Sequence, residues 1–230
     1  MSNQPIFTYP ANDEDPYLGW YKDDFSSVFV ATNPFRKVPE FPLNPQGEWV
    51  PTEVETFAKK RGHEIGVAWK EIADLCGFPS ISYVNRALRL TGSKRIDKKF
   101  ASPSDTAKMQ RLCCKHNLFI PDEGCLSPLS ELSMASFLKA LEHDEVIVAD
   151  HFGTSPRTMK SDEFLQPETF STPEIHSDDR SIFVVIYTDY HYFLICQTEG
   201  SVLKANPADF FEGFFANDET NDFWGIGDLS

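Results

Sequence analysis

The spacing of hydrophobic and polar residues changes along the chain. Residues 27–31 form a short run of β-branched and aromatic side chains that predicts a strand. Between about residues 52 and 143, apolar residues recur at helical spacing, whereas residues 145–149, 181–187 and 190–197 are dense in β-branched and aromatic side chains. We therefore predict an α+β fold, in which a central helical block packs on a mainly antiparallel sheet built from the early strand and the C-terminal strands.

Start and stop residues divide the helical block into about five helices. The predicted helices cover residues 52–61, 68–76, 80–90, 103–117 and a segment that begins after Ser127. Gly62, Gly77 and Gly92 follow the first three, where a left-handed residue commonly ends a helix. Ser102 and Pro103 supply an N-cap and a first-turn proline for the fourth.

The C-terminal part predicts a hairpin and a final helix. Thr188 and Asp189 separate two strand-like runs. Residues 202–204 predict a third strand, and a proline-started helix is expected from Asn206. Earlier in the chain, four prolines between residues 34 and 45 predict irregular structure through about residue 51.

The same patterns suggest one main domain. We expect residues 1–24 to form an extended acidic arm whose aromatic side chains pack on the body. Residues 25–230 then make a single α+β domain, helical over about 52–143 and strand-rich over about 144–230.

Composition adds an expectation about compartment. The chain has 41% hydrophobic residues and a net charge of −14, which favours a folded, soluble protein and disfavours general attraction to nucleic acid or anionic membranes. The first thirty residues are acidic and lack a long apolar run, and the five cysteines are an odd number without a C-x-x-C pair. We expect a cytoplasmic protein with reduced thiols that does not associate with membranes.

One segment departs from the acidic average. Residues 59–111 carry twelve Lys and Arg against five Asp and Glu, about +7. Within it, residues 69–89 resemble a helix-turn-helix, which would expose polar residues of the second helix to DNA. The candidate contacts are Ser82, Asn85, Arg86 and Arg89. Two helices joined by a glycine turn are also common as pure structure, and the rest of the chain would repel phosphate.

The C-terminal tail is acidic and aromatic, with no Lys or Arg after Lys204. The residues that could form a partner-binding surface are Phe214, Phe215, Phe223 and Trp224. The alternative is that these rings pack on the protein's own sheet. Glu212, Asp218, Glu219 and Asp222 could form a carboxylate cluster, although a solvated acidic face is the simpler interpretation.

Evidence for catalysis is weaker. Phosphate-binding glycine loops, the nucleophile elbow and helical H-E-x-x-H are absent from the sequence, so we predict no catalytic, cofactor or metal residues. An enzyme remains an alternative through an unrecognised His/Asp site. The residue types for it are present in Asp150, His151, His176 and Asp189, without a recognised spacing.

Several short motifs resemble a known bacterial family. They are NPFRKVP at 33–39, WKE at 69–71 opening a helix that ends in CGF at 76–78, ALR at 87–89 and PDEG at 121–124. Their order resembles that of the family called domain of unknown function 2711. The resemblance implies a stand-alone bacterial cytoplasmic protein, transfers no catalytic residue and weakens the DNA-binding hypothesis.

The leading hypothesis is thus a non-enzymatic binding or protein-interaction protein that uses an acidic, aromatic-rich surface and whose partner is another protein. DNA binding through residues 69–89 and an enzyme with an unrecognised His/Asp site are the alternatives. The sequence leaves the oligomeric state open. It also leaves open whether the basic segment is exposed or neutralised by the acidic C-terminal part.

Overall fold

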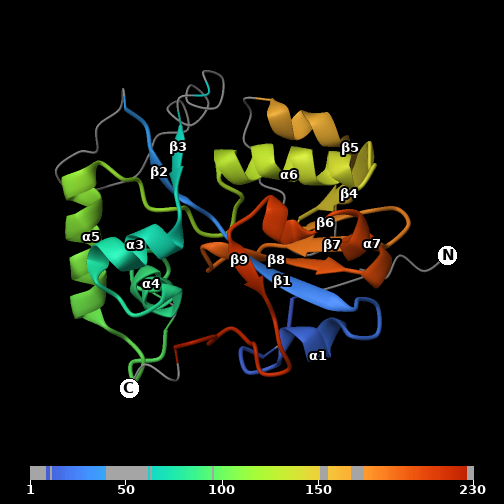
Figure 1. Ribbon diagram of the computed structural model, residues 1–230. Coiled ribbons are helices and arrows are strands. Elements are labelled where there is room, and N and C mark those ends of the chain that lie inside the picture. The colour runs from blue at the N-terminus through green and yellow to red at the C-terminus, as the bar shows by residue number, and fades with distance from the viewer. Residues whose placement is uncertain are drawn as a thin grey trace.

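A seven-stranded antiparallel sheet forms the centre of the part of the chain that the structure describes, with strand order β5-β4-β6-β7-β8-β1-β9 (Figure 1). The computed structural model describes residues 9–10, 12–39, 62, 64–94, 96–150, 155–166 and 174–226. The strands of this sheet are β1 (Ser27–Thr32), β4 (Glu145–Ala149), β5 (Arg157–Lys160), β6 (Glu174–His176), β7 (Ile182–Val185), β8 (Tyr192–Gln197) and β9 (Gly213–Phe215). A separate antiparallel pair joins β2 (Phe35–Lys37) to β3 (Ile65–Val67).

The described helices are mostly short. They are α1 (Tyr17–Tyr21), α3 (Trp69–Cys76), α4 (Ile81–Leu88), α5 (Pro103–His116), α6 (Pro128–Ala140), α7 (Glu199–Lys204) and the 3-10 turns η1 (Ser161–Leu165) and η2 (Pro207–Asp209). Among the described residues, no helix combines the length and apolar character needed to cross a membrane. The helices and the mainly antiparallel sheet confirm the predicted α+β class.

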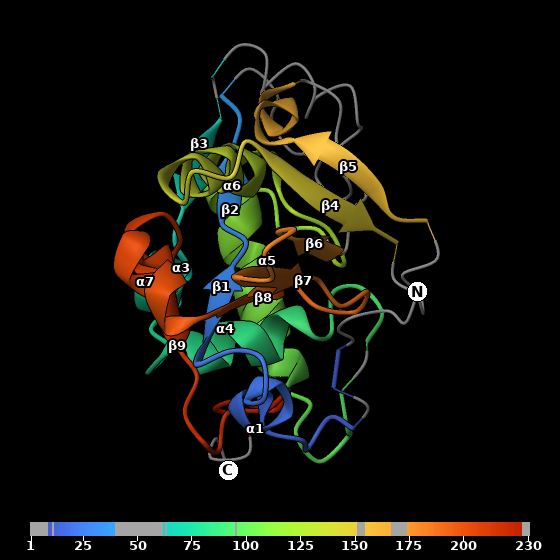
Figure 2. The ribbon, with the colours of Figure 1, turned by 90° about the vertical axis from the view of Figure 1, so that its right-hand side faces the viewer.

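Helices cover both faces of the sheet (Figures 1 and 2). Because strand side chains alternate in direction, each face buries its own set of strand residues. Val28 and Val30 of β1 join a buried cluster with residues of α1, α3, α4 and α5. Phe29 and Ala31 of the same strand join a second cluster with α6 and η1. We call these the first and the second face. The single helical block of the sequence is therefore divided in space, with α6 on the opposite side from α3–α5.

Local capping explains several helix boundaries. Ser127 Oγ accepts a hydrogen bond from Ser130 N at the start of α6, and proline occupies the first turn of both α5 and α6. Gly77 and Asn117 adopt left-handed conformations just after α3 and α5. These elements start and end within one or two residues of their predicted limits. The predicted helix over residues 52–61 lies outside the described residues.

Two C-terminal predictions were wrong. The chain over 202–204 is part of α7 and not a strand, because Thr198 Oγ1 caps the helix by accepting from Ser201 N. The helix expected from Asn206 is limited to η2, after which the chain enters β9 and pairs with β1. An added Cβ at Gly213 would lie only 2.0 Å from Val30 O, so this close strand approach requires glycine.

Two regions expected to be irregular contain regular structure. Within the N-terminal segment expected to be extended, residues 17–21 form α1, whose Tyr17 and Tyr21 are buried in the first face. In the proline-rich segment, residues 35–37 form β2, and Arg36 exchanges backbone hydrogen bonds with Phe119. Arg36 is buried and pairs with Glu64 at 2.9 Å and Asp122 at 3.2 Å.

Candidate functional site

A pocket of about 590 Å³ lies between the start of α4 and the C-terminal tail. We call it the tail pocket. Its lining residues are Ile81, Ser82, Phe214, Asn217, Glu219, Thr220, Asn221, Phe223, Trp224 and Gly225. Three of the four residues predicted for a partner surface, Phe214, Phe223 and Trp224, thus lie together. The fourth, Phe215, has a 42% exposed side chain and contacts Phe29 of the second face.

Aromatic contacts fix the wall of the tail pocket. The Trp224 ring lies 6.3 Å from Trp69 in a stacked arrangement and 5.0 Å from Phe214 edge-on. The Phe223 ring lies 5.8 Å from Phe100. Because Trp224 is 7% exposed, it is mostly a supporting wall, whereas Phe214 and Phe223 are half-buried. The rings therefore both pack on the protein's own core and line a pocket, so the two alternatives for the tail are not exclusive.

The rim of the tail pocket is a turn held by its own polar side chains. Asn217 Oδ1 accepts from Glu219 N at 3.0 Å and from Thr220 Oγ1 at 2.9 Å, and Asn221 Oδ1 accepts from Phe223 N at 3.0 Å. These bonds leave the exposed Glu219 side chain at the edge of the pocket. The described residues of the lining include neither Lys nor Arg.

A buried polar network lies behind the pocket wall and holds the tail. The Asp222 carboxylate accepts hydrogen bonds at 2.6 Å from the hydroxyls of Tyr9, Tyr17 and Tyr190. We call this group, together with Arg89, the tyrosine network. Burial raises the pKa of Asp222 although all three tyrosines donate to it. Asp222 is 2% exposed, so its role is to anchor the segment that carries the pocket.

Arg89 joins the same network from the helical side. Its guanidinium lies 3.7 Å from the centre of the Tyr190 ring, and Nη2 donates to the Tyr192 hydroxyl at 3.2 Å and to the backbone carbonyl of Asp222. Arg89 is 3% exposed. A cation of the basic segment is therefore stabilised internally by the acidic tail.

The structure does not place the four candidate DNA contacts on one exposed face. Residues 69–89 do form two helices around a left-handed Gly77, but Asn85 and Arg89 point inward and are 2% and 3% exposed. Arg86 Nη2 pairs with Asp105 Oδ2 at 2.6 Å. Ser82 lies against Gly225 and lines the tail pocket. The second helix is packed within a helical cluster, so these side chains do not make a face open to a major groove.

The described residues of the candidate His/Asp site come from separate elements of the sheet. Burial raises the pKa of Glu174, and the nearby negative charge of Asp150 raises it further. His176 lies further along β6, where it is paired with Phe183 of β7. Asp189 belongs to the turn between β7 and β8, and His151 lies outside the described residues. No group of three or more His, Cys, Asp or Glu suited to a metal ion occurs in the described part of the chain.

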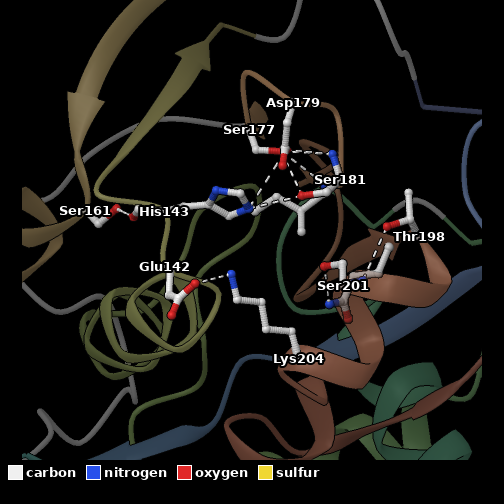
Figure 3. A network of polar contacts seen from close by, with 11 residues as sticks. Glu142, His143, Ser161, Ser177, Asp179, Ser181, Thr198, Ser201 and Lys204 are labelled. Atoms are coloured by element: carbon white, nitrogen blue, oxygen red, sulfur yellow. Dashed lines mark hydrogen bonds and ion pairs between the residues drawn. The ribbon is translucent and has the colours of Figure 1, made fainter.

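A larger groove of about 1000 Å³ borders the end of α6, β4 and η1. Beside it, His143 Nε2 lies 3.1 Å from Ser181 Oγ and 4.0 Å from Asp179 Oδ1 (Figure 3). The residue types resemble a catalytic triad, but both contacts use the same ring nitrogen. A triad needs the carboxylate on one imidazole nitrogen and the nucleophile on the other. The arrangement therefore does not activate Ser181.

Asp179 instead stabilises a turn. Its carboxylate accepts from Ser177 Oγ at 2.6 Å and from Ser181 N at 3.0 Å, as Figure 3 shows. Although burial acts to raise it, these hydrogen bonds hold the pKa of Asp179 at about 2. The groove lining mixes Lys139 and Lys160 with several acids, so it has no single charge preference.

Sequence reasoning found the rings of the tail pocket but not its polar parts. Asn217 and Asn221 belong to a run of turn-forming residues after β9, and this run is the pattern that could have identified the rim. The supposed carboxylate cluster is dispersed. Glu212 accepts from Trp69 N and Lys70 N at the start of α3, Asp222 is buried, and Glu219 is exposed.

Comparison with known proteins gives a family and no described activity. Neither a curated protein nor a solved structure matches the chain. A family model described as "Protein of unknown function (DUF2711)" matches residues 13–226, which include every motif on which the resemblance was based and the whole tail pocket. The chain therefore belongs to this family.

Proposed function

We propose that the protein is a non-enzymatic binding protein whose tail pocket takes a basic side chain from a segment of another protein. The observation that carries the proposal is the composition of the pocket, in which aromatic rings stand beside the exposed Glu219 and no Lys or Arg occurs among the described lining residues. An arginine or lysine is attracted to aromatic faces and to a nearby carboxylate. Such a side chain would contact Phe214 and Phe223 with its stem and Glu219 with its cationic end.

The charge of the whole molecule supports a basic partner. The net charge is −14, and the chain after Lys204 contains acids but no Lys or Arg. Complementary charge accelerates encounter and disfavours acidic partners. The tyrosine network supports the proposal in another way. Because it holds the pocket wall in place before binding, the wall loses little conformational entropy when the partner binds.

A competing ligand would be an anion at the start of α4. Ser80 makes no side-chain capping hydrogen bond there, and Ile81 and Ser82 line the pocket. The positive end of a helix favours anions. The helix is only eight residues long, and the anion would have to approach Glu219 as well, so we favour the basic ligand.

The test is calorimetric titration with a capped peptide of alternating arginine and threonine, alongside the same peptide with arginine replaced by glutamine and a phosphoserine peptide. We expect the arginine peptide to bind and Glu219→Gln to weaken it about tenfold, a loss equivalent to about 1.4 kcal/mol. Asp209→Asn is the matched control, because it removes the same charge from an exposed tail residue outside the pocket lining and should change affinity less than about twofold. Preference for the phosphoserine peptide, or equal effects of both variants, would contradict the proposal.

A further inference from the structure

The two edges of the seven-stranded sheet differ in how they are protected. β5 has the sequence RTMK, and its Arg157 and Lys160 are exposed charged residues of the kind that discourages pairing with another chain. β9 has the sequence GFF, with no charge, no proline and an exposed Phe215. The β9 edge is short, but it therefore lacks the charged residues and the proline that commonly protect an edge against strand addition.

The backbone register shows which groups of β9 are open. Thr32 N donates to Glu212 O at 2.9 Å, and Ala216 N donates to Val28 O at 2.8 Å. In an antiparallel pair the hydrogen-bonding residues alternate, so the backbone of Phe214 faces β1 and the N–H and C=O groups of Gly213 and Phe215 face away from it. These outward groups have no hydrogen-bond partner among the described residues.

This open edge adjoins the tail pocket. Phe214 lines the pocket, whereas Phe215 lies on the opposite face of the sheet, against Phe29. In a strand added beside β9, the residue opposite Phe214 would project to the same face with its Cβ about 5 Å away. Alternate side chains of that strand would therefore reach the pocket, while its backbone satisfied Gly213 and Phe215.

We propose that the partner segment binds in an extended form as an eighth strand on β9, with alternate basic side chains directed to the tail pocket. The inference rests on the proposed function, because it specifies how the same basic segment is held. Main-chain hydrogen bonds then supply affinity with little dependence on sequence, and the pocket supplies the preference for arginine or lysine.

Charge distinguishes this partner from a second copy of the same chain. The chain that leaves β9 passes through the exposed Asp218 and Glu219. Antiparallel pairing of β9 with β9 of a second copy would bring the acidic turn of each copy towards the segment before β9 of the other, which carries Asp209 and Glu212. Like charges across paired strands are destabilising. A basic strand would instead place positive charges beside these acidic residues.

Two substitutions at Phe215 separate strand addition from side-chain contact. Phe215→Ala and Phe215→Pro both remove the ring, but only proline removes the outward N–H, which is the position where an edge strand tolerates proline. We expect the arginine–threonine peptide to bind Phe215→Ala within about threefold of the unmodified protein and Phe215→Pro at least about tenfold more weakly. Circular dichroism and thermal unfolding of both variants verify that the fold persists.

A measurement on the unmodified protein provides a second test that needs no variant. Binding of the peptide should slow amide hydrogen exchange at Phe215, and backbone N-methylation of one alternate set of peptide residues should abolish binding while methylation of the other set does not. Equal effects of the two methylated sets, or unchanged exchange at Phe215, would overturn strand addition.

The outcomes separate the two proposals. If Glu219→Gln weakens the peptide while Phe215→Pro and N-methylation do not, the pocket function stands and strand addition is wrong. If the arginine peptide does not bind, both are wrong. A concentration-dependent dimer by analytical ultracentrifugation that Phe215→Pro abolishes would also overturn the inference, since β9 would then be occupied by a second copy.

Discussion

The two faces of the central sheet are buried in different ways. On the first face, a polar network of Tyr9, Tyr17, Arg89, Tyr190 and Asp222 lies within the hydrophobic cluster. On the second face, the cluster that joins α6 to the strands is built from aliphatic and aromatic side chains. The first face carries the tail pocket.

The difference shows what each kind of packing specifies. Aliphatic packing accepts many arrangements of similar volume, whereas hydrogen bonds to one buried carboxylate fix which tyrosines must meet it. Tyr9 and Asp222 are 213 positions apart in the sequence. The network thus positions the tail segment at one place on the helices. The second face is held mainly by apolar packing, with smaller polar contacts such as those of Ser127 N and Ser130 Oγ with Asn33 Oδ1 at the start of α6.

The largest expected effect is that of Asp222→Ala on the first face. It leaves Arg89 without part of its buried electrostatic environment and leaves tyrosine hydroxyls without their acceptor, so we expect a loss of about 3–5 kcal/mol in the free energy of unfolding. Urea denaturation measures this loss. The matched control is the exposed Asp218→Ala, which should change stability by less than about 0.5 kcal/mol. Similar losses in both variants would show that the network does not hold the tail.

Leu138→Ala tests the second face. Leu138 is fully buried in the apolar cluster, and its truncation should cost about 3 kcal/mol through lost burial and a cavity. Because no charge is involved, the loss should be the same at pH 5 and pH 8. A loss that varied with pH would mean that the two faces are not independent.

Tyr190→Phe should have a smaller effect, because it removes one of the donors to Asp222 and keeps the ring under Arg89. We expect about 1–2 kcal/mol of destabilisation by urea denaturation. Tyr83→Phe is the control, since Tyr83 packs against Phe78 and its hydroxyl makes no hydrogen bond with the described residues. If the two variants were equally stable, the Tyr190 hydroxyl would contribute nothing to the network.

A further effect concerns pH. Burial, with a further contribution from Asp150, raises the pKa of Glu174 from 4.5 to about 7. A raised pKa means that the folded protein holds this proton more tightly than the unfolded chain, so its stabilising contribution is present below pH 4.5 and is lost as the pH rises through 7. Glu174→Gln should flatten that part of the stability profile in thermal unfolding scans. An unchanged profile would assign the pH dependence to other groups.

The sequence predicted those elements whose local pattern agrees with their final environment. Residues 145–149 and the hairpin around Thr188 and Asp189 are strands because their β-branched and aromatic side chains are buried on the sheet. Short strands were missed, since three residues such as 213–215 give no periodicity, and β9 forms because β1 is available to pair with it. Residues 202–204 have strand-like composition, but the cap at Thr198 determines a helix.

The candidate site was predictable in its rings and not in its polar contacts. Phe214, Phe223 and Trp224 could be identified from a tail rich in aromatic residues without basic ones. Only the DNA-binding alternative would expose Arg89, and the sequence left open whether the basic segment is exposed or neutralised by the acidic C-terminal part. The burial of Arg89 depends on Tyr190 and Asp222, which are more than a hundred positions away, so no local pattern indicates it.

The position of β1 has a consequence for synthesis of the protein. β1 is made first among the strands, yet both of its neighbours, β8 and β9, come from the C-terminal end of the chain. During translation, the apolar segment of β1 therefore emerges from the ribosome long before any strand is available to pair with it. Such a segment is prone to aggregate until it is covered, so chaperone binding to the nascent chain is expected to matter more for this protein than its size alone suggests.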